Sequence, residues 1–204
     1  MHINNYIEHI FSNKSKIKLL RFMLWDNNDR SGRELARYVG LSHMQVHRLL
    51  KELHDEGAVT MRSVGSAFIY KINYNNYAVS NILNDIFKKE AGVLEYLKAR
   101  YLKVLIQKAD TVILFGSVNE KKERALSDLD IFVLAANIRV KKELEKEMED
   151  IAMAFLKATG NTLSPLIMTT EEYKKADKSK MGILESIKKG EILKGPPLGE
   201  ISSK

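Results

Sequence analysis

The chain has 204 residues, 45% hydrophobic and 29% charged, and its 33 Lys and Arg exceed its 26 Asp and Glu to give a net charge of +7. This length suits one large or two small domains with real cores, and the basic charge fits nucleic-acid binding. The chain lacks cysteine, a bilayer-length apolar run and a leader-like start, which excludes disulfides and thiolate metal sites and predicts a cytoplasmic protein with no membrane partner.

The first expected helix covers residues 16–25. Ile17, Leu20 and Leu24 recur there at the spacing of an amphipathic helix, and Ser15 is its expected N-cap. The polar stretch that follows predicts a turn.

Residues 31–53 predict two helices joined by a tight turn. Ala36 supplies the small side chain needed where the helices cross, and Gly40 tolerates the positive φ of the turn. Ser42 is expected to cap the second helix, and Gly57 to end it. The pattern resembles the DNA-binding helix-turn-helix signature. The residues that carry this resemblance are Ala36, Gly40, Val46 and Leu49.

A hairpin is expected next, because two β-prone runs at 58–63 and 67–72 flank a Gly-Ser turn. A helix-turn-helix followed by a hairpin resembles the winged-helix transcription regulators. This resemblance implies a winged helix-turn-helix DNA-binding domain over residues 1–77, with double-stranded DNA as its partner.

The exposed face of the second helix, together with the wing, offers side chains that can donate to base edges and phosphates. The expected DNA-binding residues are Ser42, His43, Gln45, His47, Arg48, Lys51 and Arg62. The alternative is a solvated helix face on a winged helix that binds protein. His43 and His47 have the spacing of a chelating pair, but no third ligand accompanies them.

Residues 78–94 are expected to form a helical connector. Apolar stripes run through 79–87 and 94–105, and Gly92 marks a break between them. Winged-helix proteins commonly read two half-sites as dimers. We therefore expect a homodimer, with the connector as a candidate interface.

Two buried strands are expected further along the chain. The first, at 110–115, is followed directly by Gly116-Ser117, and the second opens with Asp128 and Asp130. Alternate residues of a strand point to the same side, so the two carboxylates should share a face. Paired hard oxygen ligands suit Mg²⁺ or Mn²⁺, and a Gly-Ser bend lets the backbone approach a phosphate.

This arrangement resembles the signature of the minimal nucleotidyltransferases of the DNA polymerase beta superfamily. Gly116-Ser117, ten intervening residues and Asp128-Leu129-Asp130 carry the resemblance, and the implied domain covers residues 95–195. The resemblance implies transfer of a nucleoside monophosphate from an NTP, with ATP the expected nucleotide. Gly116 and Ser117 would bind its phosphates, while Asp128 and Asp130 would bind two metal ions and act in catalysis.

The chain departs from this family on the next expected strand, 162–168. Active members usually carry a third carboxylate there, whereas this strand has no acid. Pro165 suits an edge strand, and Glu171 and Glu172 are expected to begin the following helix. Three interpretations stay open: an Mg-dependent nucleotidyltransferase, a regulator that only senses nucleotide, and an antitoxin-type enzyme that modifies a partner protein.

The remaining elements complete an α+β chain. A helix is expected at 141–157, and another at 181–190 with Ile183, Leu184 and Ile187 turned inward. A short strand at 191–193 and a frayed end should follow. The implied fold is a winged helix-turn-helix, a helical connector and a mixed sheet with flanking helices.

Overall fold

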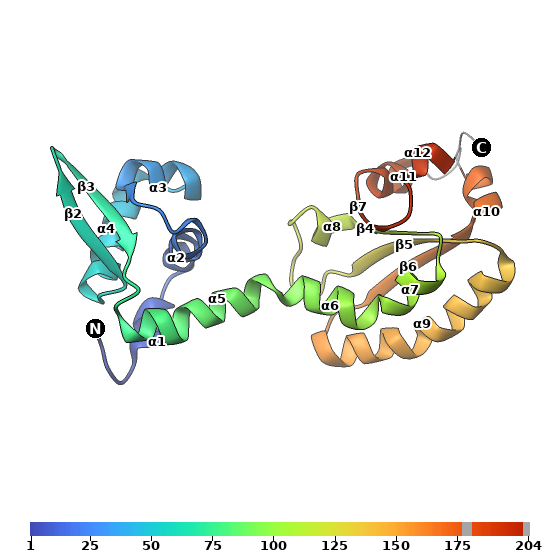
Figure 1. Cartoon of the computed structure of the whole chain (residues 1–204), viewed down its shortest axis with the longest axis horizontal. Helices are drawn as coiled ribbons and strands as arrows, with labels where there is room; N and C mark the ends of the chain where they lie inside the picture. The colour runs from blue at the N-terminus through green and yellow to red at the C-terminus, as the bar shows by residue number, and fades with distance from the viewer. Residues whose placement is uncertain (177–180, 202–204) are drawn as a thin grey trace. The chain divides into compact units, whose positions relative to one another are not determined.

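The computed structural model describes residues 1–176 and 181–201 (Figure 1). It divides into two compact units, Met1–Val93 and a second unit from Leu94 onward, and each is described by itself. Both mix helices with a sheet, so the α+β class is confirmed. None of the helices in these ranges combines the length and apolar character needed to cross a bilayer.

The first unit is a winged helix-turn-helix. Its three-stranded antiparallel sheet has the order β1-β3-β2, and its hairpin is the expected wing. Its elements are α1 (Tyr6–Ile10), α2 (Lys14–Asp26), β1 (Arg30–Ser31), α3 (Gly32–Val39), α4 (His43–Asp55), β2 (Val59–Val64), β3 (Ala67–Ile72), η1 (Val79–Leu83) and α5 (Asn84–Ala91).

Local capping fixes the helix-turn-helix. Ser31 caps α3 through a capping box with Glu34, and Ser42 caps α4 through a box with Gln45. Gly40 ends α3 with a φ of +62°, which is the left-handed conformation that a side chain disfavours. The expected helix boundaries and the turn glycine are therefore confirmed.

Three local features differ from expectation. The N-cap of α2 is Asn13, not Ser15: the Asn13 side chain accepts hydrogen bonds from the backbone of Ser15 and Lys16 at 2.7 and 3.3 Å. Helix α1 was not expected. Part of the expected turn is strand β1, which pairs with β3.

The start of the connector packs within the first unit. Val79, Leu83 and Phe87 are buried in the same core as the helix-turn-helix, while Ile86 is 40% exposed. Burial of this stripe within one chain leaves fewer apolar side chains for a dimer seam. The use of the connector as an interface stays a prediction.

The second unit is a four-stranded mixed sheet of order β6-β5-β4-β7 with helices on both faces (Figure 1). Strand β5 runs parallel to β6, and β4 is antiparallel to both of its neighbours. The elements are α6 (Val93–Tyr101), α7 (Lys103–Lys108), β4 (Thr111–Phe115), α8 (Gly116–Asn119), β5 (Leu129–Ala135), α9 (Ile138–Thr159), β6 (Leu163–Thr169), α10 (Thr170–Lys175), α11 (Met181–Lys188), β7 (Glu191–Lys194) and α12 (Leu198–Ile201).

Alternate residues of β5 face two separate cores. Leu129, Ile131 and Val133 pack with the side chains of α7 and α9. Phe132 and Leu134 pack with those of α10 and α11 on the opposite face. By the same alternation, Asp130 lies on the same face of the sheet as Phe132.

Several expectations for this unit are confirmed and two are corrected. Pro165 lies in β6, which is an edge strand, and Glu171 and Glu172 lie in the first turn of α10. Helix α9 is longer than expected at both ends, because Asn137 caps it and Gly160 terminates it. Ile183 is 41% exposed, whereas Leu184 and Ile187 are buried. Residues 202–204 of the expected frayed end lie outside the described residues.

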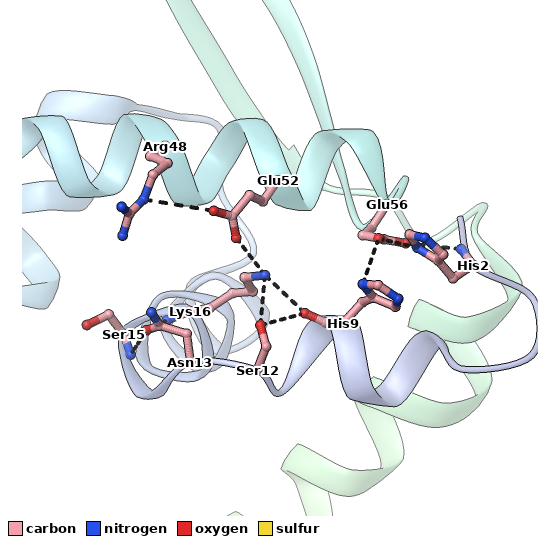
Figure 2. A network of polar contacts seen from close by, with 9 residues as sticks. All are labelled: His2, His9, Ser12, Asn13, Ser15, Lys16, Arg48, Glu52 and Glu56. Carbon is pink, nitrogen blue, oxygen red and sulfur yellow. Dashed lines mark hydrogen bonds and ion pairs between the residues drawn. The ribbon is translucent and has the colours of Figure 1, made fainter.

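A buried lysine joins three helical segments of the first unit (Figure 2). The Nζ of Lys16 donates to the carbonyl of His9 at 3.0 Å and to the hydroxyl of Ser12 at 3.2 Å, and it pairs with Glu52 at 2.7 Å. Lys16 is 5% exposed. These three contacts of Lys16 connect α1 and α2 to α4.

Replacing Lys16 by Met should lower the free energy of unfolding of the first unit by about 1–3 kcal/mol, because charge-assisted hydrogen bonds are lost in a buried place. Lys18→Met is the matched control, since Lys18 is exposed on the same helix; its effect should stay within about 0.5 kcal/mol. Chemical denaturation measures both. Equal stability of the two variants would contradict this role of Lys16.

Candidate nucleic-acid and nucleotide sites

Helix α4 buries one face and exposes the other. Val46, Leu49, Leu50 and Leu53 are in the core. The expected DNA-binding residues all lie on the exposed side or on the wing, and each is exposed. They are Ser42, His43, Gln45, His47, Arg48, Lys51 and Arg62.

Not all of these side chains are equally free. The side chains of Ser42 and Gln45 bond to each other and to each other's backbone in the capping box. Arg48 lies 3.9 Å from Glu52, a loose and exposed ion pair. Arg48 and Lys51 are therefore better placed to contact a phosphate or base edge than the two capping residues.

On the wing, Arg62 is already paired. Its guanidinium donates to Asp29 at 2.5 Å, and Lys71 lies 3.7 Å from the same carboxylate. The Arg62 guanidinium is the largest cause of the lowered pKa of Asp29. A DNA phosphate would have to replace Asp29 as the partner of Arg62. The sequence did not indicate this competition, because 33 residues separate the two side chains.

A concave surface lies between α4 and the wing, with a cavity of about 430 Å³. His43 and His47 line it from α4, and Phe68 lines it from the wing. Arg33 from α3 also lines it, and the sequence did not indicate it because it precedes α4. Among the described residues, no third His or acidic side chain joins His43 and His47 at ligating distance.

The second site lies where β4 and β5 meet. The register pairs Phe115 with Asp130. Asp128 immediately precedes β5, and Leu129 between the two acids is buried. Within the described residues, no basic side chain lies within ion-pair distance of Asp128 or Asp130. Burial, followed by the charge of Asp128, raises the pKa of Asp130. Two neighbouring carboxylates without a cation are the environment that a metal ion relieves.

Gly116 is in direct contact with this acid. Its φ is +74°, and a Cβ built on it would lie 2.2 Å from Oδ2 of Asp130. Only glycine lets the two strands bring the carboxylate against the backbone at this point. Ser117 follows in the single turn α8, half-buried, and its hydroxyl makes no hydrogen bond to the described residues. The carboxylates of Asp128 and Asp130 and the hydroxyl of Ser117 are oxygen donors, the ligand type that Mg²⁺ prefers.

The loop between Ser117 and Asp128 carries backbone strain. Lys121 and Leu126 have φ angles of +55° and +68°. Such conformations in non-glycine residues cost about 1–3 kcal/mol each and tend to occur at functional sites. Lys122 of this loop pairs with Glu120, which favours a solvated charge over a phosphate contact for that lysine.

The strand register also shows which residue stands where a third carboxylate would lie. Asp130 pairs with Ser164 on the parallel strand β6, so a third carboxylate beside Asp130 would occupy the position of Ser164. Ser164 is exposed and neutral. Glu172 cannot substitute for it, because its carboxylate caps α10 and pairs with Lys141 at 2.8 Å.

No protein-family model matches the chain, and no curated protein matches it. Solved structures with some similarity include NolR from Sinorhizobium fredii, at 19% identity over 41% of this chain and 80% of that one, with a TM-score of 0.35. A second is the homodimeric winged helix-turn-helix DNA-binding domain of Mb0332 from Mycobacterium bovis, at 17% identity over 45% and 84%, with a TM-score of 0.37. A third is HlyU from Vibrio cholerae N16961, at 19% identity over 49% and 100%, with a TM-score of 0.35.

Proposed function

We propose that the chain is a DNA-binding transcriptional regulator whose second unit binds an Mg–nucleotide complex. The observation that carries DNA binding is the exposed face of α4, where Arg48 and Lys51 stand beside a concave surface shared with the wing. A recognition helix of this kind enters the major groove, with its side chains on base edges and phosphates.

Arg48→Ala should weaken specific DNA binding by about 1–3 kcal/mol if Arg48 contacts a base. Lys51→Ala should weaken binding to all sequences and reduce the salt slope by about one, as the loss of a phosphate contact does. Fluorescence anisotropy with the full chain and labelled duplexes, first selected from random sequence, measures both effects across a salt series.

Lys142→Ala is the control of equal charge, because Lys142 is exposed on α9 in the second unit. If Lys142→Ala weakens binding as much as Lys51→Ala, the interaction follows net charge alone. The assignment of α4 as the DNA-reading helix would then be wrong.

The proposed regulator acts as a homodimer on a two-part operator, since paired half-sites are the usual target of winged helices. Sedimentation of the full chain at micromolar concentration measures this directly. A monomeric mass both with and without operator DNA would contradict it.

The nucleotide part of the proposal is supported by Gly116, Ser117, Asp128 and Asp130, which lie together at one end of the sheet. Asp128 and Asp130 would hold Mg²⁺, the Ser117 hydroxyl would bind the phosphates, and the ion would neutralise phosphate charge. Nucleotide sensing is favoured over transfer because Ser164 takes the place of the third acid. Sensing predicts saturable Mg-ATP binding together with a change in operator affinity, and an unchanged affinity would oppose it.

Nucleotidyl transfer to an RNA end or a protein acceptor, including an antitoxin-type reaction on a partner protein, is the second candidate. It is supported by Asp128 and Asp130, since neither carboxylate has an ion-pair partner among the described residues and their proximity contributes to the raised pKa of Asp130. Incubation with labelled ATP, Mg²⁺ and either cell RNA or cell extract should then give a labelled product. The same assay is also run with Mn²⁺ in place of Mg²⁺, as the condition under which transfer is least restricted.

A further inference from the structure

Two histidines near the start of the chain and a glutamate distant from them in the sequence converge at the end of α4 (Figure 2). His2 precedes α1, His9 lies in α1, and Glu56 is the C-cap of α4. The Nδ1 atoms of His2 and His9 lie 2.5 and 3.9 Å from Oε1 of Glu56. Each residue offers a ligand atom within 4.8 Å of the others, and no other three His or acidic side chains of the described ranges meet this test.

We propose that His2, His9 and Glu56 bind a divalent transition-metal ion of the zinc class. Two imidazole nitrogens and one carboxylate oxygen are a known zinc ligand set, which leaves a fourth position for water. The side chains of His2 and His9 are 52% and 41% exposed, so water can reach the ion. Imidazole ligands favour Zn²⁺, Co²⁺, Ni²⁺ and Cu²⁺ over Mg²⁺ and Ca²⁺.

Contacts around these residues hold the ligands in place. Oε2 of Glu56 accepts from the backbone nitrogen of His2 at 3.1 Å, which leaves Oε1 directed toward the imidazoles. The carbonyl of His9 accepts from Lys16, which is paired with Glu52 one turn before Glu56 on α4. The first contact orients the Glu56 carboxylate, as outer contacts do for metal ligands, and the second fixes the backbone of His9.

The donor atoms lie at nearly the spacing of a ligating arrangement, but the rings must turn to use it. Tetrahedral zinc with bonds of about 2.0–2.1 Å places its donor atoms about 3.3 Å apart. Relative to Glu56, the Nδ1 of His2 must recede and that of His9 must approach, each by less than about 1 Å on that geometry. The two rings are stacked, with centroids 3.6 Å apart and planes at 7°. Because a ring nitrogen binds a metal in the plane of its own ring, metal binding requires rotation of the His2 and His9 side chains out of this stacked arrangement.

A polar group without a partner lies in the same region. Tyr6, one turn before His9 on α1, is buried, and its hydroxyl has no hydrogen-bond partner among the described residues. Burial and, after it, the charge of Glu56 raise the pKa of Tyr6 to about 12. A water molecule bound to an ion at this place would offer the Tyr6 hydroxyl the hydrogen-bond partner that it lacks.

The alternative is that His2 and Glu56 form a hydrogen-bonded clasp that never binds metal. Titration of the tag-free full chain with Co²⁺, followed by visible absorption, separates the two ideas, because a tetrahedral site gives an intense spectrum. We expect one ion per chain, displaced by Zn²⁺. His2→Gln and His9→Gln should each weaken binding by at least about tenfold, as the loss of even an outer-shell partner does.

His43→Gln and His47→Gln are the matched controls, since both residues are exposed histidines of the same unit. They should leave the spectrum unchanged. Hydrogen exchange supplies the location: Zn²⁺ should slow exchange across residues 1–10 in the wild type but not in His9→Gln. Circular dichroism without metal checks that each variant is folded.

Three outcomes would overturn the proposal. The wild type could give no spectrum and no exchange protection. The His43 or His47 variants could lose binding while His2→Gln keeps it. Binding could instead be removed by Asp130→Asn, which would place the ion at the second unit. None of these outcomes depends on DNA or nucleotide binding.

Discussion

Replacing Gly116 by Ala should lower the free energy of unfolding of the second unit by about 2–5 kcal/mol, because backbone strain and overpacking add at this position. Gly116 has a φ of +74°, and an added Cβ would lie 2.2 Å from Oδ2 and 3.0 Å from Cγ of Asp130. The Cβ of Asp130 would lie only 3.2 Å from the added Cβ as well, so rotation of the Asp130 side chain relieves only part of the overlap. Hydrogen exchange of the β4 and β5 amides in denaturant measures this unit separately from the first.

Gly160→Ala is the control that separates the two contributions. Its φ is +75°, but nothing lies within 4 Å of an added Cβ. It should cost about 1–2 kcal/mol, the left-handed strain alone. The excess cost of Gly116→Ala then reports the contact with Asp130. Adding Asp130→Ala to Gly116→Ala should recover part of that excess, as a double-mutant cycle measures. Equal costs for the two glycines would contradict the contact.

The elements that could be predicted from sequence are those that local interactions specify. Helices α3 and α4 have serine caps with Glu34 or Gln45 three residues later, and Gly40 closes the turn between them. Apart from Thr111 in β4 and Asp130 in β5, these two strands are apolar throughout, a pattern typical of central strands. Helix α1 and strand β1 were missed because they are only five and two residues long and depend on their neighbours.

The features of the candidate sites also divide into those that local sequence predicts and those that depend on tertiary structure. Alternation along a strand was enough to predict that Asp128 and Asp130 face one side, but the identity of the residue beside Asp130 needed the β5–β6 register. The engagement of Arg62 by Asp29 depends on tertiary structure, and so does the cluster around Glu56. Histidine spacing drew attention to His43 and His47, whereas the histidines that meet an acid are 54 and 47 residues from Glu56 in sequence.

Replacing Asp130 by Asn should weaken Mg-ATP binding by at least about 100-fold, since even the partners of metal ligands are worth up to that factor. Asp128→Asn should act in the same direction. Calorimetric titration of the full chain with ATP, with and without Mg²⁺, measures both. Glu171→Gln is the control for loss of one negative charge, because Glu171 is exposed in α10, next to the same sheet.

The stability of Asp130→Asn separates a binding role from a structural one. Asp130 is half-buried and repelled by Asp128, which raises its pKa above the usual value for a carboxyl group. Removal of this charge in the absence of Mg²⁺ should therefore leave the second unit at least as stable as the wild type. A ligand-binding acid behaves in this way, whereas a structural acid destabilises the fold when it is replaced.

Ser164→Asp extends the same prediction from binding to turnover. It places a third carboxylate beside Asp130 on the neighbouring strand, at the position that the register assigns. If the missing acid limits transfer, this variant should label an acceptor faster than the wild type in the presence of Mg-ATP, and Ser164→Asn should not. Unchanged Mg-ATP binding in both Asp128→Asn and Asp130→Asn would instead show that the paired acids hold no metal, and sensing and transfer would both be wrong.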